Sequence, residues 1–456
     1  MFALNRQAMI KYSYPNPGQV LEGRREDFLQ PVKVALLGLG TVGRGVYRIL
    51  TGNAANIAQR VGAPVEISRI LVRDLTRDRG IQVDPALLTD SYQDIIDDPE
   101  INVIVEVMGG IHPALDYVMD ALKRGKSVVT ANKDMIALHG KELFAAAGAS
   151  GAGFFFEGSV AGGIPIIRPL KQCLAANRIQ EIMGIINGTT NYMLSKMTLE
   201  GMDFDQVLRE AQARGYAEAD PTSDVEGLDA ARKLAILASI AFNSRITLND
   251  VYVEGISKIT ARDIAYAREL NYVIKLLAIA KETPEGVEVR VHPTMIPQYH
   301  PLASVNDVFN AIFIRGDAVG DVMFYGRGAG ELPTGSAVVA DIMDAARHIV
   351  HRVPAFMGCT CYEEKPVKPM ALAESKYYIR LTVSDRPGVL ASIAYAFGDK
   401  EVSLASVIQK HTDGDRAEIV MVTHRVREQN LQDALRLVEC LSSVDRIDCC
   451  IRVEGE

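Results

Sequence analysis

The first 150 residues alternate short apolar runs with segments whose apolar side chains recur at helical spacing. Residues 32–37 form an apolar run that leads into a glycine turn, and the segment after it repeats apolar side chains every three or four positions: Val42, Val46, Ile49 and Leu50. Further strand-like runs follow, each separated by a helical segment, at residues 65–72, 102–107 and 127–130. Strands that alternate with helices predict a parallel sheet with right-handed crossovers. We therefore expect an α/β domain of the Rossmann type over residues 31–150.

A stretch rich in Gly, Ala and Phe at residues 148–163 interrupts this alternation and marks the start of a second unit. Its periodicity predicts helices and β-rich runs in the following order: helices at 224–242 and 259–280, strands at 287–293 and 310–314, and a long helix at 337–350. The last helix either closes the second unit or returns to the first. These patterns predict an α+β domain over residues 151–353, with a segment near 331–353 completing the first domain.

Residues 354–375 hold several prolines and two cysteines, and are typical of a linker. The remaining chain, residues 376–456, has the order strand, helix, strand, strand, helix, strand, with the elements at 377–383, 389–397, 402–409, 416–423, 431–440 and 447–453. This order predicts a ferredoxin-like domain at the C-terminus.

Composition narrows the function classes. The 456 residues are 48% hydrophobic and 23% charged, which is typical of a folded globular protein. With 49 Lys+Arg against 57 Asp+Glu, the net charge is −8, so no basic field attracts nucleic acid or anionic lipid. Six cysteines without C-x-x-C spacing favour reduced thiols in a cytoplasmic protein. The apolar runs are shorter than the roughly 18 residues of a membrane span, and residues 1–30 read as an irregular extension rather than a signal peptide.

The glycine turn has the spacing of a dinucleotide site. Residues 38–43 read Gly-Leu-Gly-Thr-Val-Gly, so Gly38, Gly40 and Gly43 match G-x-G-x-x-G, with Thr41 and Val42 opening the helix. The first glycine permits the tight turn, the second lets the backbone approach a pyrophosphate, and the third lets helix and strand pack closely. A turn that serves packing alone is the alternative, but the flanking strand and helix favour cofactor binding.

Cofactor choice is expected at the end of the next strand, where Arg73 and Asp74 stand side by side. An acid there binds the ribose hydroxyls of NAD, whereas an arginine pairs with the 2′-phosphate of NADP. A guanidinium is a good bidentate phosphate partner, so we expect NADP with NAD tolerated. Asp74 lies farther from the glycines than the usual ~20 residues, and it could simply hold Arg73 in place.

The segment 211–233 carries the second candidate site. Within its predicted helix, Asp229 and Lys233 are i and i+4 neighbours, while Asp224 and Glu218 stand at its mouth. Several acids around one lysine could bind an ammonium-bearing substrate and supply a proton donor. The alternative is a solvated salt bridge worth ~0.3–0.5 kcal/mol, which is the commoner meaning of an isolated pair.

This segment resembles the signature of homoserine dehydrogenases at the following positions: Ala211, Gly215, Asp220-Pro221, Asp224, Gly227, Asp229 and Lys233. The resemblance extends from Val32 to about Val353 and includes Val105 to Gly110, Thr130-Ala131-Asn132-Lys133, Glu157 to Pro165, Asn187 to Tyr192 and Gly326 to Gly330. It implies that residues 151–353 form a catalytic and dimerisation domain. It also implies reduction of L-aspartate 4-semialdehyde to L-homoserine by NAD(P)H, a step towards threonine, methionine and isoleucine.

The resemblance also implies a role for each matching residue. Lys233 falls on the catalytic lysine that protonates the aldehyde oxygen, and Asp229 orients it. Glu218 and Asp224 would hold the substrate ammonium, and the remaining pocket and cofactor positions fall on Tyr216, Gly188, Thr189, Lys133 and Gly328. A family sodium site matches Glu157 and the carbonyls of Val160, Gly162 and Ile164. A solvent-facing Lys133 and a plain turn at Gly328 are the alternatives.

The C-terminal domain resembles ACT domains, which pair with one another and bind amino acids at the interface. The turn between its first strand and first helix carries the candidate effector residues Asp385, Pro387, Gly388, Val389 and Leu390. In homoserine dehydrogenases with this appendage the resemblance implies L-threonine as effector and a homodimer or homotetramer as assembly. An unregulated oligomerisation module is the alternative.

Other function classes fit less well. An aspartate semialdehyde dehydrogenase needs a nucleophilic cysteine and a phosphate site, and Cys173 has no matching context. A catalytically silent amino-acid sensor is opposed by the intact Asp229 and Lys233. A fused aspartokinase is not expected, because no kinase-sized segment precedes Pro31.

Overall fold

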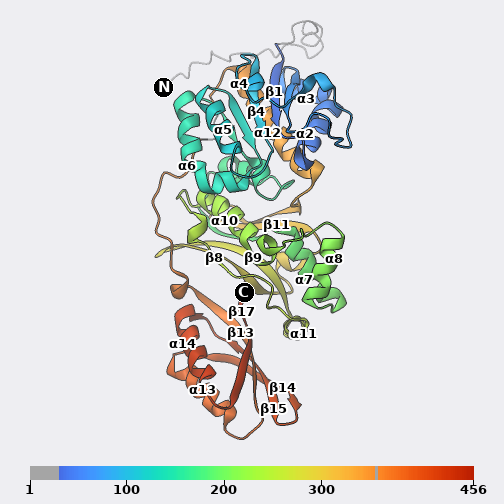
Figure 1. Ribbon diagram of the computed structural model, residues 1–456. Coiled ribbons are helices and arrows are strands. Elements are labelled where there is room, and N and C mark those ends of the chain that lie inside the picture. Colours follow the sequence, from blue (N-terminus) through green and yellow to red (C-terminus); the bar gives the residue numbers. More distant parts are fainter. Residues whose placement is uncertain (1–29, 355–357, 456) are drawn as a thin grey trace, which may run out of the picture.

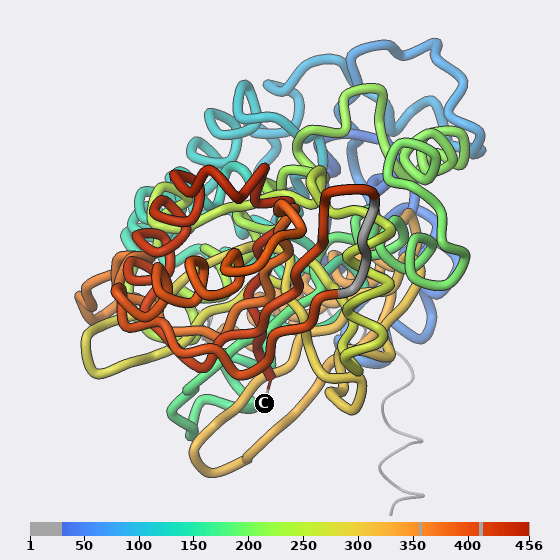
Figure 2. Tube along the Cα trace, turned by 90° about the horizontal axis from the view of Figure 1, so that it is seen from below, coloured from blue at the N-terminus to red at the C-terminus, as the bar shows by residue number. Residues whose placement is uncertain are grey.

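Three units follow one another along a single long axis in the computed structural model, which describes residues 30–354 and 358–455 (Figure 1). The N-terminal unit lies at one end and the C-terminal unit at the other. Figure 2, which looks along this axis from below, places the C-terminal segment in front of the other two units. The irregular extension predicted for residues 1–30 falls almost wholly outside the described residues.

The first unit is built on a parallel sheet with the strand order β3-β2-β1-β4-β5-β6. Its elements are β1 (Val32–Leu37), α2 (Thr41–Gly52), α3 (Ala54–Val61), β2 (Val65–Leu71), β3 (Leu88–Thr89), α4 (Gln93–Ile96), β4 (Ile101–Glu106), α5 (Ala114–Lys123), β5 (Ser127–Thr130), α6 (Lys133–Ser150) and β6 (Phe154–Phe155). The strand order changes direction at β1. The carboxyl ends of β1 and β4 therefore flank the crevice where such sheets bind ligands.

Helix α12 (Glu331–His351) returns from far along the chain and packs on α2 in the first unit (Figure 1). Two glycines permit the crossing, because a Cβ at Gly335 would lie only 2.8 Å from the carbonyl carbon of Gly45. Val338 and Ile342 of α12 are buried in the same apolar cluster as β1. Of the two placements predicted for this helix, the structure has the return to the first unit.

Among the described residues, the second unit combines five α-helices with one half of a large mixed sheet. Its elements are β7 (Ile179–Ile185), α7 (Gly188–Glu200), α8 (Phe204–Ala213), α9 (Thr222–Val225), α10 (Leu228–Ala241), β8 (Tyr252–Val253), α11 (Ala261–Glu269), β9 (Tyr272–Thr283), β10 (Gly286–Pro297), β11 (Phe309–Gly316) and β12 (Gly320–Arg327). The strand order in this half is β12-β11-β7-β9-β10.

Two predicted helices differ from the structure. The helix predicted at 259–280 is wrong beyond Glu269, because Asn271 turns with φ +63° and β9 begins at Tyr272. β9 is a central strand whose residues 274–280 are all buried, and periodicity alone does not separate such a run from a buried helix. The helix predicted at 224–242 is interrupted at Gly227, whose φ of +79° divides α9 from α10.

The C-terminal unit has the predicted ferredoxin-like order. Its elements are β13 (Glu374–Ser384), α13 (Val389–Asp399), β14 (Leu404–Asp413), β15 (Arg416–Thr423), β16 (Val426–Arg427), α14 (Glu428–Glu439) and β17 (Val444–Val453). β17 also pairs in parallel with β10, with Thr294 opposite Arg452, so its sheet continues that of the second unit. The predicted fold class, an α/β sheet domain followed by an α+β and a ferredoxin-like domain, is confirmed.

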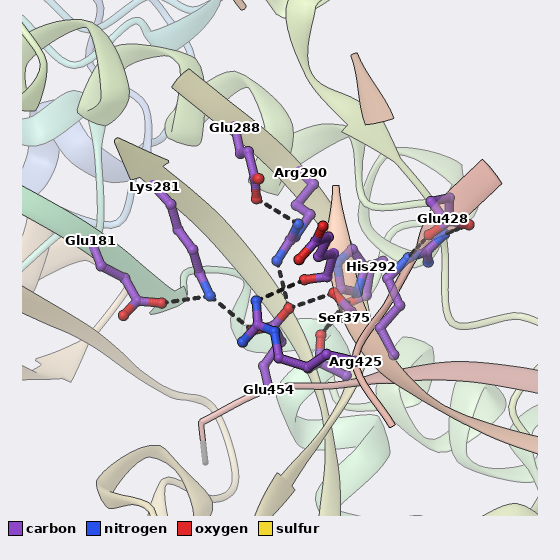
Figure 3. Close-up of polar contacts among 12 residues, drawn as sticks. Glu181, Lys281, Glu288, Arg290, His292, Ser375, Arg425, Glu428 and Glu454 are labelled. Atoms are coloured by element: carbon purple, nitrogen blue, oxygen red, sulfur yellow. Dashed lines mark hydrogen bonds and ion pairs between the residues drawn. The ribbon is translucent and has the colours of Figure 1, made fainter. Parts of the chain in front are cut away.

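Buried ion pairs reinforce this junction (Figure 3). Glu454, just after β17, accepts hydrogen bonds from Arg290 (2.5 Å) and Lys281 (2.8 Å) of the second unit and from Ser375 (2.8 Å) of β13. Burial alone would raise the pKa of Glu454, but Arg290 and Lys281 lower it to about 2. The C-terminal unit is thus joined to the second unit by strand pairing and by charge. Within the described ranges, no helix is long and apolar enough to cross a membrane.

Candidate active site

The glycine turn after β1 has the backbone geometry that a dinucleotide loop requires. Gly38 has φ +104°, and a side chain at Gly43 would collide with the Gly38 carbonyl, so both positions need glycine. Nothing lies within 4 Å of where a Cβ of Gly40 would stand, which leaves that backbone open to a ligand. No side chain caps α2, so the amides of Thr41 and Val42 keep their donors at the positive helix end.

A cavity of about 750 Å³ opens in front of this turn. Besides Gly38, Gly40 and Thr41, its walls carry four arginines: Arg44, Arg73, Arg77 and Arg79. The sequence predicted only Arg73; the others come from α2 and from the loop after β2, whose basic character was the available signal. Asp74 Oδ1 accepts hydrogen bonds from the backbone N–H (2.8 Å) and hydroxyl (2.7 Å) of Thr76, so one oxygen of this carboxylate is engaged.

The predicted lysine and aspartate meet at the start of α10. Lys233 Nζ donates to Asp229 Oδ2 at 2.6 Å and to the carbonyl of Ile186 at 2.8 Å. Lys133, the first residue of α6, lies 3.3 Å from Asp229 Oδ1. Because α6 follows β5, this ion pair brings α10 against the carboxyl edge of the first sheet. A lysine ammonium has three N–H donors, and two of those of Lys233 are held by these acceptors.

Asn187 bridges the two carboxylates of this cluster, and the sequence interpretation assigned it no role. Its Nδ2 donates to Asp224 Oδ1 (2.7 Å) and to Asp229 Oδ2 (2.9 Å), while its Oδ1 accepts from the Thr190 N–H (2.9 Å) and caps α7. The signal in the sequence was an Asn directly before a helix, which marks a capping residue. Its contact with two acids about 40 residues later along the chain is a tertiary feature that no local pattern contains.

The two aspartates have opposite electrostatic environments. Burial would raise the pKa of Asp229, but Lys233 and Lys133 outweigh burial and hold that pKa well below its ordinary value. Burial and the neighbouring Asp229 raise the pKa of Asp224, against the hydrogen bond from Asn187. Asp229 is therefore a permanent anion beside two lysines, and Asp224 is an acid whose charge responds to its partners.

The other predicted substrate residues are placed unevenly. Thr189 Oγ1 donates to the carbonyl of Tyr216 at 2.7 Å, which joins the start of α7 to the loop after α8, and Gly188 begins the same helix. Tyr216 is 41% exposed and packs edge to face on Tyr192. Glu218 lies exposed on this loop, and none of its hydrogen bonds or ion pairs with described residues reaches the cluster. Its role as substrate acid stays a prediction.

The loop predicted to hold sodium lies beside the glycine loop before α12. Gly162 faces Gly328 so closely that a Cβ at Gly162 would lie 2.5 Å from the Gly328 carbonyl oxygen. Within the described chain, the buried residues Val160, Gly162 and Ile164 receive no hydrogen bond at their carbonyls. Carbonyl oxygens of this kind fit a hard cation. The Glu157 carboxylate instead accepts the amides of residues 166–168, so its part as a ligand stays a prediction.

The candidate effector turn precedes α13 of the C-terminal unit. Gly388 has φ +90° and precedes α13 as its N-cap residue, without a side-chain cap. The Val389 N–H donates to the Arg386 carbonyl at 3.4 Å, whereas no described residue accepts the backbone N–H of Leu390. Asp385 Oδ1 accepts a hydrogen bond from Gln409 at 3.1 Å, which ties the turn to β14. This part of the chain offers an acidic side chain and helix amides on an exposed surface.

Fold and site together define a class of protein. A glycine turn opens a large cavity at the carboxyl edge of a parallel sheet, and a lysine held by aspartate stands at that edge. The arrangement is that of an oxidoreductase that uses a nicotinamide dinucleotide.

Comparisons with known proteins identify the family within this class. The family profile described as homoserine dehydrogenase matches residues 165–343, that described as homoserine dehydrogenase, NAD binding domain, matches 38–157, and that of the ACT domain matches 377–439. The chain is 43% identical to the homoserine dehydrogenase of Bacillus subtilis over 94% of this chain and 99% of that protein. It is 47% identical to that of Synechocystis over 92% and 99%. The chain belongs to the homoserine dehydrogenases.

Solved structures agree with this assignment. A homoserine dehydrogenase from Thiobacillus denitrificans superposes with a TM-score of 0.89 at 45% identity, covering 94% of this chain and 99% of that one. A hyperthermophilic archaeal homoserine dehydrogenase in complex with NADPH gives a TM-score of 0.60 at 28% identity, over 72% of this chain and all of that one. The chain is accordingly an oxidoreductase that acts on a CH–OH group.

Proposed function

We propose that the enzyme interconverts L-aspartate 4-semialdehyde and L-homoserine, with NADP preferred and NAD tolerated, as a cytoplasmic enzyme of threonine, methionine and isoleucine biosynthesis. The observation that carries the proposal is the held ammonium of Lys233. Asp229 and the Ile186 carbonyl take two of its donors, which leaves the third for the oxygen of a substrate.

The role that we assign to each residue follows from its charge. When bound, the nicotinamide would supply the hydride that the aldehyde carbon accepts. Lys233 donates a proton to the aldehyde oxygen and takes it back in the reverse direction, while Asp229 orients the lysine. Asp224, together with Glu218, receives the substrate ammonium. Gly188, Thr189 and Tyr216 line the pocket, and Lys133 adds positive charge beside Asp229.

The cofactor preference rests on the arginines of the cavity. Arg73 and Arg77 form no ion pair with a described residue and stand free for a 2′-phosphate, whereas Asp74 is engaged with Thr76. Gly38, Gly40, Thr41, Val42 and Gly43 would hold the pyrophosphate, and Gly328 would approach the nicotinamide end. A sodium ion would bind the carbonyls of the 157–164 loop and hold it beside Gly328.

Regulation and assembly complete the proposal. The C-terminal domain binds L-threonine at the turn of Asp385, Pro387, Gly388, Val389 and Leu390, and this binding inhibits the enzyme. We further propose a homodimer or homotetramer. Strand β12 supports this assembly, because it lies at the free edge of the large sheet and exposes Met323 and Tyr325.

The test is a spectrophotometric assay of NADP⁺ reduction by the purified full-length chain with L-homoserine. We expect NADP⁺ reduction that depends on homoserine and needs no phosphate. The same reaction should be slow with 4-hydroxybutanoate, which lacks the amino group. Absence of homoserine-dependent reduction in folded protein would refute the proposal. Phosphate-dependent oxidation of the semialdehyde would also refute it, because that reaction is the one of aspartate semialdehyde dehydrogenases.

A further inference from the structure

Asn310 lies between the two glycines that the proposed site assigns to substrate and cofactor. It is the second residue of β11, opposite Gly326 of β12, and is only 1% exposed. A Cβ at Gly188 would lie 3.6 Å from Asn310 Oδ1, and a side chain at Gly328 would collide with the Asn310 amide. One buried side chain thus touches both the first turn of α7 and the glycine loop before α12.

The carbonyl oxygen of this side chain has no hydrogen-bond partner among the described residues. Asn310 Oδ1 is buried, and no described residue donates a hydrogen bond to it. A buried acceptor without a donor destabilises the fold, so it calls for a physical reason. The neighbouring asparagines do not share this property. Asn187 is bonded through both side-chain atoms, and Asn191 donates to Asp307 and Phe309 and accepts from Lys275.

The backbone that carries Asn310 is held on two sides. Asn191 of α7 donates to the carbonyls of Asp307 (2.9 Å) and Phe309 (3.0 Å). The buried Lys275 of β9 donates to the carbonyl of Val305 at 2.5 Å. The oxygen therefore sits on a fixed support, which keeps this acceptor in one place between Gly188 and Gly328.

We propose that Asn310 Oδ1 is a ligand-binding acceptor that receives an N–H group of the bound reactants. The inference rests on the proposed function and adds a binding residue to it. Two groups of the reacting pair have the required chemistry: the carboxamide N–H of the nicotinamide, on the side of Gly328, and the ammonium of the amino acid, on the side of Gly188. Either bond would fix one reactant against the other at the point of hydride transfer.

The experiment removes the acceptor and each donor in turn. Asn310→Ala is assayed in the homoserine-oxidising direction with NADP⁺ and with its 3-acetylpyridine analogue, in which a methyl group replaces the amide nitrogen. It is also assayed with homoserine and with 4-hydroxybutanoate. With the natural pair, the loss of one hydrogen bond should lower kcat/KM about 10- to 100-fold. One of the two analogues, the 3-acetylpyridine cofactor or 4-hydroxybutanoate, lacks the group that donates to Asn310. With that analogue, the kcat/KM of wild type and of Asn310→Ala should differ by less than about 2-fold.

Matched variants separate binding from support. Asn306→Ala removes an exposed amide of the same segment that accepts from Lys275, and it should affect all four combinations equally. Asn310→Asp keeps an acceptor of the same shape and should recover part of the loss. Thermal unfolding checks that each variant folds, and calorimetric titration with NADPH and its acetyl analogue gives a readout without turnover.

The outcomes are distinct. Loss confined to the natural cofactor assigns the bond to the carboxamide, and loss confined to homoserine assigns it to the ammonium; both support the proposal. Equal losses for every combination in folded Asn310→Ala would make the residue a support for the Gly328 loop and overturn the proposal. If wild-type protein does not oxidise homoserine, the proposed function fails, and the titration still decides whether Asn310 contacts the cofactor.

Discussion

The amide nitrogen of Asn187 lies 2.7 Å from Oδ1 of Asp224, and the same nitrogen also donates to Asp229. One uncharged side chain thereby separates two carboxylates that would otherwise repel each other. It also opposes the rise in the pKa of Asp224 that burial and Asp229 cause.

Asn187→Ser should therefore move the pH dependence of substrate use. A serine still caps α7 but does not reach both acids, so the pKa of Asp224 rises further and the acid becomes neutral at a higher pH. Because an ionised Asp224 is needed for the substrate ammonium, the acidic limb of kcat/KM for homoserine should shift upwards. The KM for NADP⁺ should stay unchanged, and an unshifted limb would contradict the role of Asn187.

Arg73 and Arg77 should decide the choice between cofactors. Arg73→Ala and Arg77→Ala should each raise the KM for NADPH by about 10-fold and leave that for NADH within about 2-fold, because only NADPH carries the 2′-phosphate. Arg60→Ala, an exposed arginine of α3 that bonds to Asn56, serves as the control. An equal rise in the KM for NADPH and for NADH would mean that these arginines attract both cofactors by their charge and do not recognise the 2′-phosphate.

Asp385 should control threonine sensitivity without changing basal activity. We expect Asp385→Ala to raise the threonine concentration for half-inhibition at least about 10-fold, because the charged partner of the effector ammonium is lost. Point variants are preferable to truncation, since β17 pairs with β10 and removal of the domain would expose that strand. Glu439→Ala, an exposed acid of α14, is the control. Unchanged inhibition in Asp385→Ala would remove this turn from the effector site.

Glu454 should make the junction of the C-terminal domain sensitive to acid. Its pKa falls from 4.5 to about 2 in the folded chain, so its ion pairs stabilise the fold fully above about pH 4.5 and are lost as the pH falls towards 2. Glu454→Gln should lower the free energy of unfolding at pH 7 by about 3 kcal/mol, and the difference from wild type should shrink towards pH 3. Urea unfolding at several pH values measures this, with exposed Glu439→Gln as control. A difference independent of pH would contradict it.

Local sequence patterns predicted much of this architecture. The strand, glycine turn and helix at 32–50 were predictable because the apolar period changes at Gly38, where only glycine accepts the observed φ. Strand β9 was not predictable, because a strand buried on both faces shows no alternation of apolar and polar residues. The return of α12 to α2 was one of two open choices, and it depends on contact between Gly45 and Gly335, which lie far apart in the sequence.

The site divides in the same way. The pair of Asp229 and Lys233 was predictable from i,i+4 spacing and from the family signature. Local patterns did not predict the roles of three further residues, Asn187, Arg77 and Asn310. Their roles depend on the residues and ligands that face them in the folded chain. Asp74 adjoins Arg73 in sequence, yet its hydrogen bonds to Thr76 became visible only with the side chains in place.

The central claim is that Lys233 is the proton donor of a homoserine dehydrogenase. The most direct test is kcat for homoserine oxidation by Lys233→Ala, beside calorimetric binding of NADPH and the control Lys141→Ala, an exposed lysine of α6. Since general acid–base catalysis contributes ~10²–10⁴-fold, we predict a fall of kcat by at least about 100-fold with NADPH affinity retained. A Lys233→Ala enzyme that keeps more than about a tenth of the wild-type rate would contradict the account.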